Sequence, residues 1–128
     1  MIRIDRLDHL VLTVKDAASS CDFYERVLGF RTLCAEGRWS LAFGRQKINL
    51  HQGGSDFDPK AERPTVGSGD LCFISTETVP DILRHLDALH VEIVDGPVGR
   101  HGAIGPMTSV YCRDPDGNLI EIAVYAAS

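Results

Sequence analysis

The chain has 128 residues, of which 44% are hydrophobic and 24% charged, and a formal net charge of −5 at pH 7. This length and composition suit a single globular domain with one sizeable core. The negative charge argues against a nucleic-acid partner, and no apolar run approaches the roughly 20 residues that would span a membrane.

Four cysteines are scattered through the chain without any Cys-x-x-Cys pair, at positions 21, 34, 72 and 112. Such spacing indicates reduced, buried thiols rather than a disulfide framework or a zinc site. The first residues, Met-Ile-Arg-Ile-Asp-Arg, lack the continuous apolar core of a signal peptide. Together these features predict a cytoplasmic protein.

The first half of the chain predicts one strand, one helix and three more strands. Residues 6–14 are nearly all apolar except His9, and a helix capped by Asp16 is expected to end at Gly29. Three short strands separated by glycine turns are predicted at residues 30–35, 39–43 and 47–51. Residues 53–69 are rich in glycine, serine, proline and charge, which predicts a linker.

The second half repeats the same order. It predicts a strand at 70–75, a helix at 79–89 with leucine and isoleucine on one face, a strand at 91–94, a loop at 96–106, a strand at 107–112 and a closing strand that ends at Tyr125. An offset of 61 residues aligns His9 with Asp70, and an offset of 72 aligns Asn49 with Glu121. The loop at 96–106 is predicted to absorb the difference.

The repeat predicts an α+β fold with two tandem βαβββ modules inside a single domain, residues 1–128. Module one spans about residues 4–52, a linker about 53–68, and module two about 69–126. Module two ends in Asp-Pro-Asp-Gly-Asn-Leu-Ile-Glu, residues 114–121, where a turn leads into an apolar strand. Glu121 interrupts that strand, and a carboxylate in such a place needs a partner or a metal.

Three segments in this order and spacing resemble the vicinal oxygen chelate superfamily, which includes glyoxalase I, bleomycin-resistance proteins, fosfomycin-resistance transferases and extradiol dioxygenases. The segments are residues 7–14 (Leu-Asp-His-Leu-Val-Leu-Thr-Val), 23–30 (Phe-Tyr-Glu-Arg-Val-Leu-Gly-Phe) and 114–121. The resemblance covers almost the whole chain and is strongest to small lactoylglutathione lyase-like proteins. It implies curled sheets around a cavity that holds a divalent metal.

The resemblance and the repeat together imply a metal site with ligands on the first and last strand of each module. The ligand set is His9, His51, Asp70 and Glu121, with Asn49 at the position that matches Glu121 by symmetry. His51 lies two residues after Asn49, so it projects from the same strand face. Such a set suits nickel, zinc, manganese or iron as the divalent ion.

Simpler interpretations of these residues stay open. A histidine in an apolar strand is often a core residue, Asp70 can cap a turn, and His51 can end its strand in solvent. Glyoxalase-like members usually carry histidine at the Asp70 place and glutamate or glutamine at the Asn49 place, so the chain departs from the family at both positions.

Three residues of the second half are predicted to bind substrate. Arg100 and His101 lie in the expected glycine-rich loop, and Tyr111 is a candidate cavity wall. A guanidinium can attract an anionic substrate group such as a carboxylate. The alternative for Arg100 is a solvated surface position, and for Tyr111 it is ordinary core packing.

The resemblance implies a small-molecule substrate with two adjacent oxygens and a glyoxalase-type lyase or isomerase reaction. The metal would stabilise an enediolate, with Glu121, or Asp70 if it is not a ligand, as general base. One alternative is an extradiol dioxygenase, whose signature the segment 99–121 nearly matches except for one extra residue after His101. Another is a drug-binding or fosfomycin-type resistance protein. The resemblance also implies a homodimer.

Overall fold

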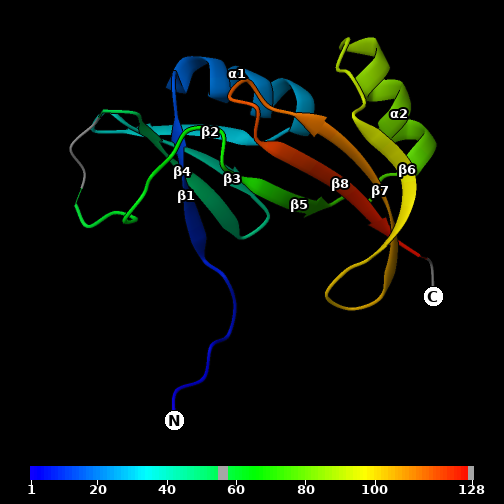
Figure 1. Ribbon diagram of the computed structural model, residues 1–128, viewed down its shortest axis with the longest axis horizontal. Coiled ribbons are helices and arrows are strands. Elements are labelled where there is room, and N and C mark those ends of the chain that lie inside the picture. The colour runs from blue at the N-terminus through cyan, green and yellow to red at the C-terminus, as the bar shows by residue number, and fades with distance from the viewer. Residues whose placement is uncertain (55–57, 127–128) are drawn as a thin grey trace. The chain divides into compact units, whose positions relative to one another are not determined.

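The structure is a computed structural model that describes residues 1–54 and 58–126 of the chain. These residues contain two helices and eight strands in two four-stranded sheets. The chain divides into two compact units, Met1–Gly67 (unit 1) and Ser68–Ser128 (unit 2). Each unit runs strand, helix, three strands (Figure 1). The predicted α+β fold of two tandem βαβββ modules is therefore confirmed.

Unit 1 places one helix on one face of its sheet. Its elements are β1 (His9–Val14), α1 (Ala17–Leu28), β2 (Arg31–Ala35), β3 (Arg38–Phe43) and β4 (Gln46–Gln52). The strand order is β1-β4-β3-β2, in which β1 runs parallel to β4 and the other neighbours are antiparallel. Strand β1 therefore lies at one edge of the sheet, beside β4, the last strand of the unit.

Local sequence accounts for both ends of α1. The carboxylate of Asp16 accepts a hydrogen bond from the Ser19 amide at 3.1 Å, which is the usual N-cap arrangement. Gly29 ends the helix with φ of 70°, a left-handed conformation that glycine adopts without steric cost. The buried side of α1 includes Tyr24 and Val27, which belong to the core of unit 1.

The other face of the unit 1 sheet is not covered by α1, and we call it the open face of unit 1. Strand residues alternate between faces, and the buried residues of β4 are Ile48 and Leu50. The intervening positions, with their partners on neighbouring strands, define the open face: His9, Val11, Thr13, Arg31, Leu33, Ala35, Arg38, Ser40, Ala42, Lys47, Asn49 and His51.

Unit 2 follows the same plan. Its elements are β5 (Asp70–Ile74), α2 (Val79–Ala88), β6 (Asp95–His101), β7 (Pro106–Arg113) and β8 (Leu119–Tyr125). The strand order is β5-β8-β7-β6, with β5 parallel to β8. Thr78 caps α2 by accepting from the Asp81 amide at 3.2 Å, and Ile82 and Leu86 bury its apolar side.

Both sheets have the same register, as the sequence offsets predict. His9 lies opposite Lys47 in unit 1, and Asp70 lies opposite Leu119 in unit 2. Two residues further along each strand, Val11 faces Asn49 and Cys72 faces Glu121. The open face of unit 2 accordingly carries Asp70, Cys72 and Ile74 on β5, Leu119, Glu121 and Ala123 on β8, and Ser109, Tyr111 and Arg113 on β7.

Two predictions about residues 91–106 are wrong. Residues 91–94 form no strand, and β6 occupies residues 95–101, inside the expected loop. Gly96 has φ of 97°, and a Cβ there would lie 2.4 Å from the carbonyl oxygen of Ser109. The glycine thus permits close approach of β6 to β7, where the register shifts between Asp95 and Val98.

The extra residues of unit 2 are also placed differently from the prediction. They are spread over the connection before β6, the β6–β7 hairpin and the β7–β8 turn, rather than held in one loop. All four cysteines are unpaired thiols, but only Cys21 and Cys112 are buried, so the prediction of buried thiols is wrong for Cys34 and Cys72. No helix within the described ranges is long and apolar enough to cross a membrane.

Candidate functional site

The open face of unit 2 holds a cavity of about 360 Å³. It is lined by residues from all four strands and from the segment before β6: Asp70, Val94, Asp95, Arg100, Tyr111, Arg113, Leu119 and Glu121. Three carboxylates and two guanidinium groups therefore face one small space. This mixture can bind a polar substrate and position a proton acceptor beside it.

Glu121 lies in the middle of β8 and is half-buried. The Ser109 hydroxyl, which is fully buried on β7, donates a hydrogen bond to Oε2 of Glu121 at 2.6 Å. Within residues 1–54 and 58–126, no cationic side chain lies at ion-pair distance from this carboxylate. Sequence reasoning missed Ser109, because nothing in the sequence indicates that its hydroxyl meets Glu121.

Asp70 begins the neighbouring strand β5 and is exposed. It faces Leu119, so it lies two residues from the Cys72–Glu121 pair on the same sheet face. Both carboxylates line the cavity, and carboxylate oxygens are ligands that a hard divalent cation prefers.

Cys72 lies directly opposite Glu121, two residues after Asp70 on β5. Although the residue is partly exposed, burial of its thiol raises the pKa of Cys72 to about 11, and the negative charge of Glu121 adds to this effect. The thiol therefore stays protonated at neutral pH, which makes it a poor metal ligand and a poor nucleophile.

The Asp-Pro-Asp-Gly-Asn turn ties the two site strands together. Asp114 is buried; its Oδ1 accepts from the amides of Asp116 and Asn118 at 2.9 Å, and its Oδ2 accepts from the Asn118 side chain at 2.8 Å. The buried Asn118 in turn accepts from the amide of Gly69 at 2.7 Å. Because Gly69 precedes Asp70, the turn fixes the start of β5 beside β8. The motif thus positions the site rather than entering it.

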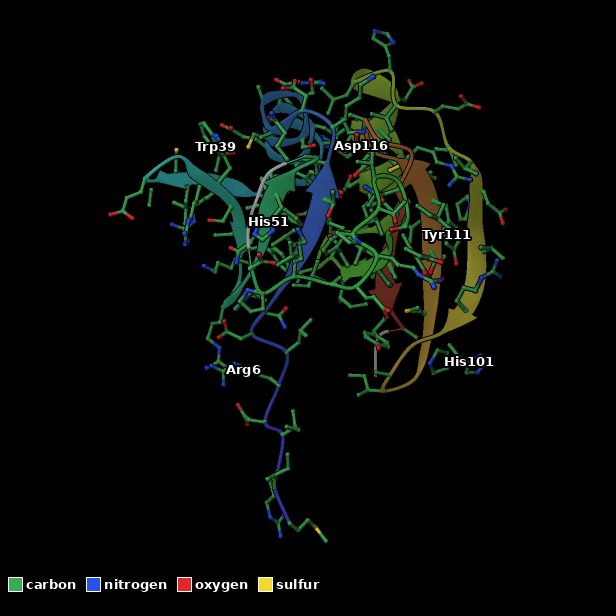
Figure 2. The ribbon with its side chains drawn as sticks, turned by 60° about the vertical axis from the view of Figure 1, so that its left-hand side comes forward. Arg6, Trp39, His51, His101, Tyr111 and Asp116 are labelled. Carbon is green, nitrogen blue, oxygen red and sulfur yellow. The ribbon has the colours of Figure 1, made fainter. Side chains whose placement is uncertain are left out.

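The predicted substrate-binding residues separate into two groups. The Arg100 guanidinium donates from Nε to the Tyr111 hydroxyl at 3.0 Å, lies 5.6 Å from the centre of that ring, and has Asp95 at 3.6 Å. Arg100 and Tyr111 both line the cavity. His101 is exposed at the far end of β6, opposite Pro106, and is not among the lining residues (Figure 2).

In unit 1, His9 and His51 share the open face but not one rung. His9 faces Lys47, whereas His51 faces Thr13, four residues further along. At about 3.3 Å per residue this separates the two by roughly 13 Å along the strands. Asn49, midway between, occupies the register position of Glu121. The register therefore favours Asn49 over His51 as the unit 1 counterpart of that carboxylate.

His9 already has a carboxylate beside its ring. Its Nδ1 lies 2.8 Å from Oδ2 of Asp8, and both side chains are exposed. A carboxylate on one ring nitrogen orients many metal-binding histidines and leaves the other nitrogen for the ion. The arrangement suits a ligand role for Nε2 of His9.

Neither unit alone supplies a full set of metal ligands. Within the described part of each unit, no three His, Cys, Asp or Glu side chains are grouped closely enough to hold one ion. Unit 2 offers Asp70 and Glu121, and unit 1 offers His9 with the neutral Asn49. A catalytic metal normally takes three protein ligands or more.

Paired βαβββ units with matching open faces define the class of protein. The family description Glyoxalase/Bleomycin resistance protein/Dioxygenase superfamily matches residues 6–122. The chain belongs to this superfamily, as its motifs predict.

Several relatives are similar over nearly the whole chain. The virulence protein STM3117 of Salmonella typhimurium is 54% identical, over 95% of this chain and 85% of the relative. Its crystal structure matches 98% of this chain and all of that chain, at 52% identity and a TM-score of 0.95. The glyoxalase domain-containing protein RDO1 of Mycosarcoma maydis is 47% identical, over 97% of this chain and 70% of the relative.

The structures that resemble this fold include an enzyme of the glyoxalase type. The lactoylglutathione lyase of Agrobacterium tumefaciens is 25% identical, with a TM-score of 0.74 over 95% of each chain. These likenesses establish the superfamily.

Proposed function

We propose that the chain is a metal-dependent lyase or isomerase of the glyoxalase type, acting on a small substrate with two adjacent oxygens. The observation that carries this proposal is the placement of Glu121 and Asp70. Both carboxylates line one cavity, two residues apart on neighbouring strands, and neither is paired with a cation among the described residues. Unneutralised carboxylates gathered in one site suit a divalent metal.

The donor set fits a divalent ion such as nickel, zinc, manganese or iron. Asp70 and Glu121 offer carboxylate oxygens, and the repeat assigns His9 and Asn49 as the corresponding donors of unit 1. His51 stays an additional candidate on β4. When bound, the ion would polarise the two substrate oxygens and acidify the adjacent C–H bond.

The residues of unit 2 then have distinct roles in proton transfer. Ser109 donates to Oε2 of Glu121 and so fixes this carboxylate, whose other oxygen would be available to a metal ion or to the substrate proton. Glu121 accepts that proton, and Asp70 takes this role if Glu121 remains a ligand. Arg100, fixed by its hydrogen bond to Tyr111, contacts an anionic or carbonyl group of the substrate.

We also propose that the working form is a homodimer, which the membership of this superfamily supports. Sedimentation at working concentration tests this proposal, and a monomer with full metal occupancy contradicts it.

Titration of metal-stripped protein with Mn²⁺, followed by electron paramagnetic resonance, tests the site. Asp70→Asn and Glu121→Gln should each weaken binding at least about tenfold, since even second-shell changes cost 10- to 100-fold. Glu92→Gln is the matched control, because Glu92 is an exposed carboxylate of unit 2 outside the cavity. Unchanged Mn²⁺ affinity in both site variants refutes the metal site.

Deuterium exchange tests the reaction. The metal-loaded protein should exchange the C–H proton of a 2-hydroxy carbonyl compound with D₂O, seen by proton NMR, and Glu121→Gln should abolish this exchange. Oxygen uptake with a catechol and Fe²⁺ would instead support ring cleavage. Tight binding of a drug that persists without metal and in both variants would support a sequestering protein.

A further inference from the structure

Unit 1 holds a second and larger cavity, of about 600 Å³, which is lined mostly by residues of its open face. It lies over β2, β3 and β4, and is lined by Leu33, Cys34, Ala35, Glu36, Arg38, Trp39, Ser40, Lys47, Asn49, Leu50 and His51. Figure 2 shows Trp39 and His51, which come from the neighbouring strands β3 and β4. The metal hypothesis uses His51 and Asn49 only, so most of this lining has no assigned role.

The cavity is cationic although the chain is acidic. Arg38 and Lys47 carry positive charge there and His51 can add another, whereas Glu36 is the only carboxylate among the described residues of the lining. The whole chain has a net charge of −5. A local excess of positive charge in a concave site focuses the field and draws anions toward it.

Lys47 lies where an unpaired lysine is costly. It is half-buried on β4, an inner strand of the sheet, between His9 of β1 and Ala42 of β3. Within the described residues of unit 1, its ammonium makes no ion pair at contact distance, and its charge acts on the exposed Asp8, whose pKa it helps to lower. Lysine is seldom withdrawn from water without a partner, so a half-buried ammonium without a carboxylate at contact distance is suited to an anion from solution.

The register arranges neutral polar groups between the two cations. Ser40 of β3 faces Asn49 of β4, with Leu33 of β2 on the same rung. Lys47 precedes Asn49 by two residues on β4, and Arg38 precedes Ser40 by two residues on β3. Because the two strands are antiparallel, Lys47 and Arg38 lie on opposite sides of the Ser40–Asn49 pair. The hydroxyl and amide can donate hydrogen bonds between two charged ends, and Leu33 supplies an apolar contact.

We propose that this cavity binds a small organic anion through a carboxylate or phosphate group held by Lys47 and Arg38. Arginine binds either group with two parallel hydrogen bonds, and lysine binds it as a point charge. Ser40 and Asn49 orient the remainder of the ligand. The proposal needs neither the metal nor the lyase reaction, so it stands or falls separately from the proposed function.

The chain contains its own reporter for this site. Trp39 is the only tryptophan of the sequence and lines the cavity, so its fluorescence should change when the cavity fills. The metal-stripped protein is titrated at constant ionic strength with glutarate, with glycerol 3-phosphate, and with the neutral compounds glutaramide and glycerol. Calorimetry in parallel detects binding that leaves the fluorescence unchanged.

Saturable binding of one or both anions, without binding of their neutral analogues, is expected. Preference for glutarate or for glycerol 3-phosphate assigns the group as carboxylate or phosphate. Lys47→Gln and Arg38→Gln should each weaken binding about tenfold, the usual worth of a hydrogen bond to a charged group. Arg31→Gln is the matched control, because Arg31 is a cation of the same open face outside the cavity lining.

Three results would overturn the proposal. The first is no saturable anion binding by either method in protein that circular dichroism shows to be folded. The second is equal binding of the neutral compounds. The third is an equal loss in Arg31→Gln, which would reduce the effect to general charge attraction. Anion binding that survives in Glu121→Gln while Mn²⁺ binding is lost would keep this site and the metal site distinct.

Discussion

The two open faces have one register and opposite chemistry. In unit 2 the face presents carboxylates, and Glu121 and Asp70 line its cavity. In unit 1 the corresponding positions hold Asn49 and His9, and Asn49 lines a cavity that also contains Arg38 and Lys47. The residues opposite His9 and Asp70 also differ in charge, because Lys47 of unit 1 corresponds to the apolar Leu119 of unit 2.

The backbone determines which positions reach each open face, and the side chains determine which ions that face attracts. The repeat fixes the positions from which a side chain enters each open face, because the strand pairing of β1 with β4 matches that of β5 with β8. The residue type at those positions then decides whether the face attracts a cation or an anion. Changes at matched positions therefore test the comparison directly.

The turn before β8 contains a buried hydrogen-bond network, whereas the turn before β4 does not rely on one at Arg45. The largest expected effect comes from removing the network before β8. Asp114 is buried and its carboxylate accepts three hydrogen bonds, so Asp114→Ala also leaves the buried side-chain NH₂ group of Asn118 without this acceptor. The free energy of unfolding should fall by about 3 kcal/mol or more, measured by urea denaturation. The turn before β4 has no such network at the exposed Arg45.

Arg45→Ala is the comparison variant, since an exposed turn residue should change the free energy of unfolding by less than about 0.5 kcal/mol. Equal losses in the two variants would show that the Asp114 network adds nothing to the turn. A loss confined to Asp114→Ala should also expose the Gly69 amide to hydrogen exchange, because Asn118 no longer holds it.

The sequence was sufficient for the repeat and insufficient for the contacts that support it. The alignment of His9 with Asp70 and of Asn49 with Glu121 follows from apolar alternation, which strands display directly. Strand β6 was missed because Gly96, with its neighbouring proline and glycine, has the composition of a loop, whereas its conformation permits close strand approach.

The support of the candidate site depends on contacts between distant residues. Ser109 is twelve residues from Glu121, and Asn118 is 49 residues from Gly69. A serine or an asparagine carries no local signal for such a partner. The turn preference of Asp114 and Asn118 was visible, but its use in anchoring β5 appears only when β5 and β8 are paired.

A smaller effect is expected from converting unit 1 toward unit 2. Asn49→Glu places a carboxylate at the register position of Glu121, so it should strengthen Mn²⁺ binding about tenfold, or about 1.4 kcal/mol. The same change should weaken anion binding in the unit 1 cavity. Ser40→Glu is the control, because Ser40 faces Asn49 and gains the same charge on the adjacent strand. Equal gains in Mn²⁺ affinity would show that added charge acts without the register.

The smallest expected effect concerns the thiol of Cys72, which lies opposite Glu121. The corresponding residue of unit 1 is Val11. Folding raises the pKa of Cys72 from 9.0 to about 11, so folding favours the protonated thiol. The associated stability is complete below about pH 9 and is lost as the pH rises to 11. Cys72 should therefore react slowly with iodoacetamide at pH 8.

Glu121→Gln removes the negative charge that contributes to this shift, second to burial. The pKa of Cys72 should then fall, and the alkylation rate should rise by about threefold, since one full pKa unit would give about tenfold more thiolate. Mass spectrometry of the alkylated peptides measures Cys72 and Cys34 in one sample. Cys34 is an exposed thiol of unit 1, so its rate should not change. Equal acceleration of both would mean that the variant loosens the protein generally, and the charge of Glu121 would then have no specific effect on Cys72.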